Sequence, residues 1–255
     1  LIGGIDLSVG ATLALSLMTS AWLYRVHDVP FVLCILVSLL TGVLIGVLNG
    51  ILSTYGRIQP FVATLATMSA CSGLALYVTN GQPINDFPDW YVAITDNSVL
   101  GLPLEGLILV GTYLVAAFWL RFRPSGRALY AVGGNAEVAR LSGLNVTRIK
   151  IRVYATAGFL AALAGILVGS NLDSAQPTAG TADLLNVIAV VVIGGASLSG
   201  GSGGMLNTFI GLLIIGTLNN GMALLNVSPN LQPVVIGAAI IVAVLTDRAS
   251  RARES

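Results

Sequence analysis

Very few residues of this sequence carry side chains that could do covalent chemistry. The 255 residues include one histidine, His27, and two cysteines, Cys34 and Cys71, which both lie inside apolar runs. A hydrolase embedded in a membrane would need a serine, a histidine and an acid together, and a metal site would need clustered ligands. The sequence offers neither pattern, so we expect no catalytic residue and no metal on this chain.

A glycine-rich stretch, GGASLSGGSGG at residues 194–204, could in principle cradle a phosphate with its backbone. A phosphate-binding loop is followed by Lys and Ser or Thr, and a dinucleotide fingerprint needs G-x-G-x-x-G. Residues 194–204 match neither motif. We therefore expect no cofactor on this chain, and we interpret the stretch as a flexible turn where two apolar segments meet.

The composition indicates that most of the surface faces lipid. Hydrophobic residues make up 55% of the chain and charged residues only 9%, and the mean hydropathy is +0.89. Soluble domains carry about 25% charged residues. These values exclude a water-soluble globular enzyme and a disordered chain. The net charge of +1 gives no basic field for phosphates, which excludes a nucleic-acid binder.

Asp6 is the one good candidate for an ionisable group inside the membrane. An aspartate at the centre of a membrane helix costs about 2.5–3.5 kcal/mol on insertion scales, so it needs a physical reason. Two interpretations are open: Asp6 binds backbone or a neighbouring helix in a broken segment, or it caps a helix near the surface. One acid cannot form the relay of an ion-driven carrier.

Uncharged amide side chains are more numerous than acids in the apolar part of the chain. Amides donate and accept hydrogen bonds without the desolvation cost of a charge, so they suit a pathway for a hydroxyl-rich solute. The alternative for each is a hydrogen bond between helices. With Asp6, the candidate translocation residues are Asn49, Gln82, Asn171, Gln176, Asn207, Asn219 and Asn220.

Long apolar runs predict an all-α, polytopic transmembrane bundle forming one domain over residues 1–255. A helix needs about 20 apolar residues to cross the hydrocarbon core, and the runs do not alternate as barrel strands would. Some segments look broken or short, which suggests a lined cavity, although close glycine packing is an alternative. The eight predicted spans are about 6–23, 30–53, 59–79, 105–120, 153–172, 184–199, 205–224 and 233–246.

The distribution of charge predicts the orientation of these spans. Lys and Arg concentrate on cytoplasmic loops, and residues 121–152 contain seven of them against the single acid Glu137. Residues 80–105 contain four acids and no basic residue. Loop 121–152 and the C-terminus should therefore be cytoplasmic and residues 80–105 external. Arg25 is the one basic residue on the opposite side, close to Asp28.

Small residues recur at four-residue spacing in two of the apolar runs. Such stripes let membrane helices approach closely, so that dispersion replaces the missing hydrophobic drive. We interpret them as packing within the chain, and a dimer face is the alternative. The stripes contain Gly42, Gly46 and Gly50 in one run and Ala161, Gly165 and Gly169 in the other.

A short helix is predicted within the basic loop, at about residues 136–142. Asn135 is a good N-cap, Gly143 supplies a left-handed stop, and Glu137 and Arg140 are spaced i,i+3 for an ion pair. A helix of two turns is marginal alone in water, so it should dock. Its apolar positions Ala136, Val138, Ala139 and Leu141 could engage a cytoplasmic partner. Lipid headgroups are the alternative.

Five sequence blocks together resemble the permease subunits of sugar-importing ABC transporters, the ribose, xylose, arabinose and galactose group. The resemblance covers essentially the whole chain and is nearest to ribose-type permeases. One departure concerns an acidic pair that family members often carry, where this chain has Leu184 and Asn186. The blocks are GGIDLSVG, LNGILSTYGRIQPFVATLATMSACSGLALYVTNGQPI, GRALYAVGGNAEVARLSGLNV, VIAVVVIGGASLSGGSGG and LNNGMALLNVSP.

The resemblance implies ten spans per subunit. Because the chain starts at Leu1 inside an apolar run, we interpret it as a fragment without about two N-terminal spans. The third block resembles the cytoplasmic segment that couples the permease to its ATPase. The predicted coupling residues are Gly133, Gly134, Asn135, Ala136, Glu137, Ala139, Arg140 and Gly143.

We therefore predict a multi-pass permease of the bacterial inner membrane that passes a monosaccharide, a pentose such as ribose, inward by alternating access. The resemblance implies three kinds of partner: a second identical or different permease subunit, ATP-binding subunits that carry the ATP and Mg²⁺, and a periplasmic or lipid-anchored sugar-binding protein. An ion-coupled secondary sugar carrier and a channel are the alternatives.

Overall fold

Proline and left-handed residues set the limits of the first helices. In the computed structural model, which describes residues 1–99 and 101–254, helix α1 (Val9–His27) ends at Asp28 with φ of 50°. Pro30 precedes helix α2 (Phe31–Thr54), and Pro60 is the first residue of helix α3 (Pro60–Val78). Proline suits a helix start because its missing N–H would have no partner there.

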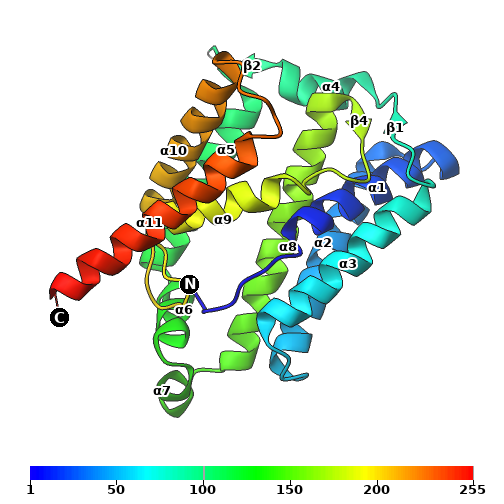
Figure 1. Ribbon diagram of the computed structural model, residues 1–255. Coiled ribbons are helices and arrows are strands. Elements are labelled where there is room, and N and C mark those ends of the chain that lie inside the picture. The colour runs from blue at the N-terminus through cyan, green and yellow to red at the C-terminus, as the bar shows by residue number, and fades with distance from the viewer. Residues whose placement is uncertain (100, 255) are drawn as a thin grey trace. The chain divides into compact units, whose positions relative to one another are not determined.

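Helices account for nearly all the regular structure, so the expected all-α class is confirmed (Figure 1). The four strands among the described residues have two residues each. After α3 the described chain continues with β1 (Ile84–Asn85), α4 (Asp89–Asp96), β2 (Ser98–Val99), β3 (Leu102–Pro103), α5 (Leu104–Phe122), α6 (Pro124–Gly134), α7 (Ala136–Leu141), α8 (Val146–Leu172), β4 (Ser174–Ala175), α9 (Asp183–Ile193), α10 (Met205–Leu224) and α11 (Gln232–Glu254).

Among the described residues, five helices are long and apolar enough to cross a membrane: α2, α3, α5, α8 and α10. The predicted count of eight spans is therefore not confirmed. Helix α9 and residues 232–243 of α11 form shorter apolar helices. Because a helix rises 1.5 Å per residue, the 11 residues of α9 cover only about 16 Å. The predicted run at 184–199 is interrupted by Gly195, whose φ is +71°.

Two predicted boundaries also differ from the structure. Helix α8 begins at Val146, seven residues before the predicted span, because Asn145 caps it by accepting the backbone N–H of Arg148 at 3.0 Å. Hydropathy detects only the part of a helix that crosses lipid, whereas backbone hydrogen bonding continues through a basic first turn. At the other end of the chain, residues 1–8 are not helical although a span from residue 6 was predicted.

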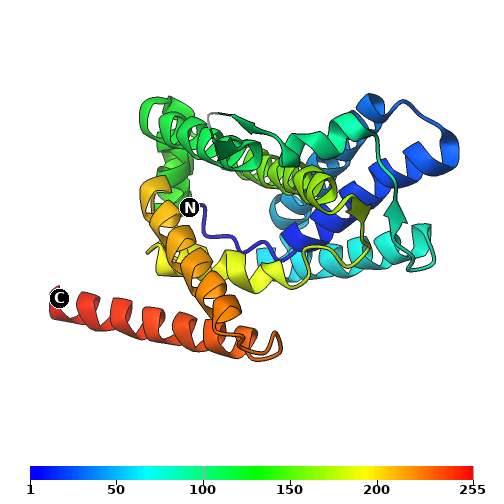
Figure 2. The same cartoon turned by 90° about the horizontal axis from the view of Figure 1, so that it is seen from above.

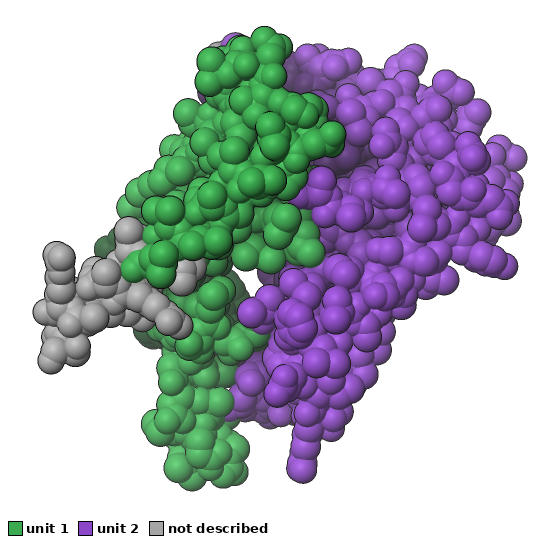
Figure 3. Space-filling view, viewed as in Figure 1, with its two compact units in different colours: residues 1–4, 113–144, 183–255 green, residues 5–112, 145–182 purple. Residues whose placement is uncertain are grey.

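The chain forms two compact units, which Figure 3 distinguishes by colour. Unit 1 contains residues 1–4, 113–144 and 183–255, and unit 2 contains residues 5–112 and 145–182. The first residues of the chain therefore divide between the units within one extended segment. Each unit has its own buried apolar cluster, and each is described separately.

In unit 2, helices α1, α2, α3 and α8 pack together, and the most extensive contact is between α2 and α8. A Cβ atom added to Gly42 would overlap the carbonyl oxygen of Gly158, and one on Gly46 would overlap that of Tyr154. Gly50 faces Ile151 in the same way. The first glycine stripe thus lies against a helix of the same chain.

The second stripe, on α8, faces α1. A Cβ atom on Gly165 would lie 2.8 Å from the carbonyl oxygen of Leu13, and one on Gly169 would lie 2.5 Å from the side chain of Leu17. Backbones that approach this closely gain dispersion contacts along their length. Since α8 contacts both α1 and α2 through these residues, it is the central helix of unit 2.

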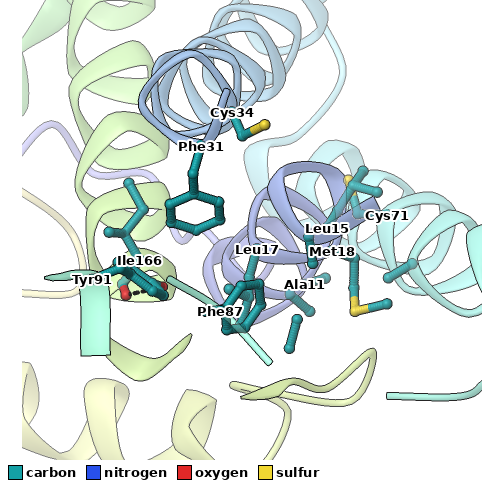
Figure 4. Packing of buried hydrophobic residues seen from close by; sticks show 14 residues of the cluster. Ala11, Leu15, Leu17, Met18, Phe31, Cys34, Cys71, Phe87, Tyr91 and Ile166 are labelled. Atoms are coloured by element: carbon teal, nitrogen blue, oxygen red, sulfur yellow. Dashed lines mark hydrogen bonds between the residues drawn. The ribbon is translucent and has the colours of Figure 1, made fainter. Parts of the chain in front are cut away.

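Aromatic side chains form part of this core (Figure 4). The rings of Phe31 and Tyr91 lie 4.6 Å apart, and those of Phe31 and Phe87 lie 5.4 Å apart. The Tyr91 hydroxyl donates a hydrogen bond of 2.5 Å to the carbonyl oxygen of Ile166. Nearby, β1 and β4 pair antiparallel, with Ile84 opposite Ala175.

In unit 1, helices α9, α10 and α11 share a smaller buried cluster. Figure 2 follows α10, in orange, into α11, in red. A Cβ atom on Gly211 would overlap the carbonyl oxygen of Val190, which lets α10 approach α9 closely. The cluster consists of Ala189, Val190, Ile215, Met222 and Ile236.

The contact between α2 and α8 gives a first prediction. Gly46→Leu is expected to lower the free energy of unfolding by about 1–3 kcal/mol or more, because the side chain must displace the α8 backbone. Thermal unfolding and the monodisperse yield in detergent measure the effect. Gly73→Leu is the matched control, since a Cβ atom there meets nothing within 4 Å. Equal behaviour of the two variants would contradict the role given to this contact.

Candidate functional site

The extended segment before α1 is held by side chains rather than by helical hydrogen bonds. Both the backbone N–H and the hydroxyl of Ser8 donate to Asp6 Oδ1, at 2.9 and 2.6 Å. The backbone N–H of Leu7 donates to Thr64 Oγ1 of α3 at 3.1 Å, and this hydroxyl lies 3.1 Å from the carbonyl oxygen of Ile5. Non-helical backbone at membrane depth needs such partners.

Asn49 of α2 extends this network into the core of unit 2. Its Nδ2 donates to Ser8 Oγ at 2.8 Å, and its Oδ1 accepts from Thr67 Oγ1 of α3 at 2.7 Å. Asn49 is fully buried. Both ends of the amide are thus occupied by protein groups, which links α2, α3 and the segment before α1.

The contacts of Asp6 are local, since both of its hydrogen bonds come from Ser8, two residues further along the chain. Ser8, not Asp6, occupies the N-cap position of α1, and it makes no side-chain capping bond. Asp6 instead binds the backbone of a broken segment, and Ser8 connects it to Asn49.

The other candidate translocation residues lie at helix ends or on outer faces. In unit 2, Gln82 lies in the turn after α3, Asn171 in the last turn of α8 and Gln176 after β4, and all three are exposed. In unit 1, Asn207 lies in the first turn of α10, and Asn219 and Asn220 lie near its end. Asn219 is half-buried and the other two are exposed.

Sequence reasoning missed Ser8, Thr64 and Thr67, which complete the buried network. A signal was present, since Thr64 and Thr67 are spaced i,i+3 within an apolar run and so lie on one face of α3. Hydroxyl residues are common in membrane helices, and their side chains often bond only their own backbone. The spacing alone therefore did not distinguish these two from the others.

The predicted short helix in the basic loop is α7. The Asn135 side chain accepts the backbone N–H groups of Glu137 and Val138, both at 3.0 Å. At the other end, Gly143 has φ of +85° and donates its N–H to the carbonyl oxygen of Arg140 at 3.0 Å. Both predicted caps are therefore present, and α7 is held in unit 1 next to α6.

Glu137 and Arg140 form a two-pronged ion pair on α7. Arg140 donates to the two carboxylate oxygens of Glu137 at 3.1 and 2.6 Å. These hydrogen bonds and the positive charge lower the pKa of Glu137 below its ordinary value. The pair is therefore intact at neutral pH and is lost only as the pH falls through this lowered pKa.

The apolar side chains of α7 divide into a buried and an exposed set. Ala139 is only 3% exposed, whereas Val138 is 57% and Leu141 is 74% exposed. Gly133 and Gly134 end the preceding helix α6, and Ala136 begins α7. Within the residues that the structure describes, no three His, Cys, Asp or Glu side chains form a metal-binding group.

Comparison with known proteins gives the family. Residues 1–244 match the family model described as "Branched-chain amino acid transport system / permease component". The ribose import permease RbsC of Bacillus subtilis is 48% identical over 97% of this chain, and that of Haemophilus influenzae is 45% identical over 97%. The chain belongs to the permease components of ABC transporters. The resemblance read from the five sequence blocks is thereby confirmed.

The permease is a non-catalytic, multi-pass membrane subunit. It spans about 77% of the length of both ribose permeases. A D-allose transport system permease of Escherichia coli is 37% identical over 97% of this chain and 76% of its own. No solved structure matches the chain.

The polar network around Asn49 gives a second prediction. Asn49→Ala is expected to lower the free energy of unfolding by about 1–3 kcal/mol, because Ser8 and Thr67 each lose a buried partner. Thermal unfolding of the purified permease measures the difference. Gln82→Ala removes an exposed amide and is expected to stay within about 0.5 kcal/mol of the unmodified chain. If the two variants unfold together, the network does not hold the extended segment.

Proposed function

We propose that the permease imports ribose, or a closely related monosaccharide, by alternating access driven by ATP hydrolysis on a partner subunit. The relatives named as ribose import permeases, at 45–48% identity, support the substrate. The allose permease at 37% supports the wider class of monosaccharides. The observation that carries the proposal is the structure of α7, a short helix with both ends capped and an ion pair on its surface, which exposes two apolar side chains to solvent.

We propose that α7 inserts into a groove of an ATP-binding subunit, which supplies ATP and Mg²⁺. The caps and the Glu137–Arg140 pair make this short helix rigid before it docks, which reduces the ordering cost of binding. Val138 and Leu141 would enter the groove. The whole segment, Gly133 to Gly143, would then move with the ATPase as one lever.

The proposed orientation puts loop 121–152 and the C-terminus in the cytoplasm and residues 80–105 outside. The excess of Lys and Arg in the loop supports this. Arg25, the one basic residue assigned to the outer side, lies 3.6 Å from Asp86 of the acidic segment. An ion pair with an external acid agrees with an external arginine.

The eight-span count is also part of the proposal. The eight spans would be the five long apolar helices, α1 with its 19 residues, and the shorter apolar helices α9 and Gln232–Ala243. A helix as short as α9 can lie at membrane depth only where protein or a water-filled cavity surrounds its ends. This supports a cavity beside α9 as part of the path.

For the path itself, we propose that Asp6 and Asn49 fix its shape and that the exposed amides contact the sugar. Asn49 already uses both ends of its amide within unit 2. The exposed side chains have free hydrogen-bonding capacity for sugar hydroxyls. These are Gln82, Asn171, Gln176, Asn207 and Asn220, with Asn219 half-buried. A second permease subunit and an external sugar-binding protein would complete the importer.

Docking through α7 gives a third prediction. Leu141→Asp is expected to weaken binding of the ATP-binding subunit at least about tenfold, because a charge would enter an apolar groove. Co-purification and titration in detergent measure this loss. Leu102→Asp is the control, since Leu102 is also well exposed, at 56%, but lies on β3. Unchanged binding by Leu141→Asp would leave lipid headgroups as the surface that α7 contacts.

The energy source gives a fourth prediction. In proteoliposomes that contain the assembled importer, uptake of labelled ribose is expected to stop when ATP is withheld and to continue when ion gradients are collapsed. The physical reason is that Asp6, a single half-buried acid, cannot form an ion relay. Uptake that survives without ATP and stops with an ionophore would identify a secondary carrier. Uptake that needs neither would identify a channel.

A further inference from the structure

Three backbone segments of unit 1 meet at one point: residues 1–4, the end of α6 and the glycine-rich loop 194–204. The backbone N–H of Gly201 donates to the carbonyl oxygen of Leu1 at 2.9 Å. The Tyr130 hydroxyl of α6 donates to the carbonyl oxygen of Gly203 at 3.0 Å. Figure 1 shows the N-terminus beside α6 and this loop. We call this meeting point the glycine junction.

The backbones at the glycine junction touch directly, without side chains between them. A Cβ atom on Gly133 would overlap the carbonyl oxygen of Leu1. One on Gly201 would lie 2.7 Å from Gly134 Cα, and one on Gly200 would lie 2.5 Å from the backbone nitrogen of Gly3. These distances leave no room for a methyl group on any of the three.

Three glycines of the glycine junction have left-handed backbone conformations. The φ angles of Gly3, Gly200 and Gly201 are +71°, +89° and +77°, a region that other residues rarely adopt. The packing glycines of α2 and α8 differ from those of the glycine junction, because they bring two regular helices into contact. In the glycine junction, by contrast, the joined pieces are a helix end, a loop and an extended segment, each of which leads to a different part of the permease.

The connections of the three pieces suggest what the contact does. Gly134 is followed by Asn135 and then by α7, while the loop continues into α10 at Met205. Residues 1–4 continue along the chain into the segment that Asp6 and Asn49 fix. Close-packed backbone passes on a displacement because it has no side-chain rotamers with which to absorb it.

We propose that the glycine junction transmits the movement of α7 to the extended segment before α1 and to the start of α10. This inference depends on the proposed function, in which α7 moves with an ATPase. Gly133, Gly200 and Gly201 are positioning residues here: they act through the segments they join and not through the sugar. The glycine junction makes those segments move together, so that closure of the ATP-binding subunits changes the conformation of the translocation path.

Two alanine variants in the same loop separate this role from simple backbone strain. Gly201→Ala adds a methyl group against Gly134, whereas Gly195→Ala adds one where nothing lies within 4 Å. The two positions have nearly the same φ, +77° and +71°. Left-handed strain is therefore matched, and only the contact with α6 differs.

The readout is coupling in the importer assembled from the full chain, its ATP-binding subunit and its sugar-binding protein. Gly201→Ala is expected to keep ATPase binding and basal hydrolysis while the ribose imported per ATP falls at least about fivefold. Gly195→Ala is expected to retain the original ratio. Equal ratios in the two variants, with ATP-dependent uptake still present, would overturn the inference and leave the proposed function intact.

A milder variant covers the case in which Gly201→Ala does not assemble. Tyr130→Phe removes only the hydroxyl that holds Gly203, and it is expected to lower the same ratio in the same direction. An unchanged ratio in this variant would count against the inference. Uptake by the unmodified importer that needs no ATP would instead refute the proposed function itself.

Discussion

Backbone N–H and C=O groups outside regular helices need hydrogen-bond partners, and this requirement decides how residues 5–8 are held. Helices satisfy it internally, but an extended segment cannot. Here the Thr64 hydroxyl accepts the backbone N–H of Leu7 and donates to the carbonyl oxygen of Ile5. The Asp6 carboxylate accepts the backbone N–H of Ser8. The acid at the start of the chain is therefore part of a structural network that joins α1 to α2 and α3. A broken segment of this kind can exist only because its neighbours supply the missing partners.

Close approach of glycine backbones is the second interaction on which the permease depends, and it acts in two ways. Between α2 and α8, Gly42 and Gly46 bring two regular helices into contact along several turns. In the glycine junction, Gly200 and Gly201 join the end of helix α6 to an extended segment and a loop. The first contact resists any relative movement of the two helices. The second joins three short stretches of chain: residues 1–4, the end of α6 and the loop around Gly200 and Gly201.

The parts of the structure that follow from local spacing could be predicted from the sequence. The N-cap at Asn135, the left-handed Gly143 and the Glu137–Arg140 pair all depend on residues at most four positions apart, and the structure contains all three. The contact between Asn49 and Ser8 joins residues 41 positions apart. Nothing in either local sequence selects the other as its partner. The predicted spans 153–172 and 184–199 also differ in their limits from α8 and α9, because hydropathy reports lipid contact and not backbone hydrogen bonding.

The loop at 194–204 shows why composition alone gave an incomplete account of the candidate site. Many glycines predict flexibility, because glycine has the widest choice of backbone angles. The same absence of a Cβ atom allows backbone to touch backbone, and the structure uses it in this way at Gly133, Gly200 and Gly201. Gly195 and Gly204 meet nothing within 4 Å, so freedom and close contact alternate within one loop. The proposed coupling to an ATPase would use both properties, since the subunit would bend at some points and transmit movement at others.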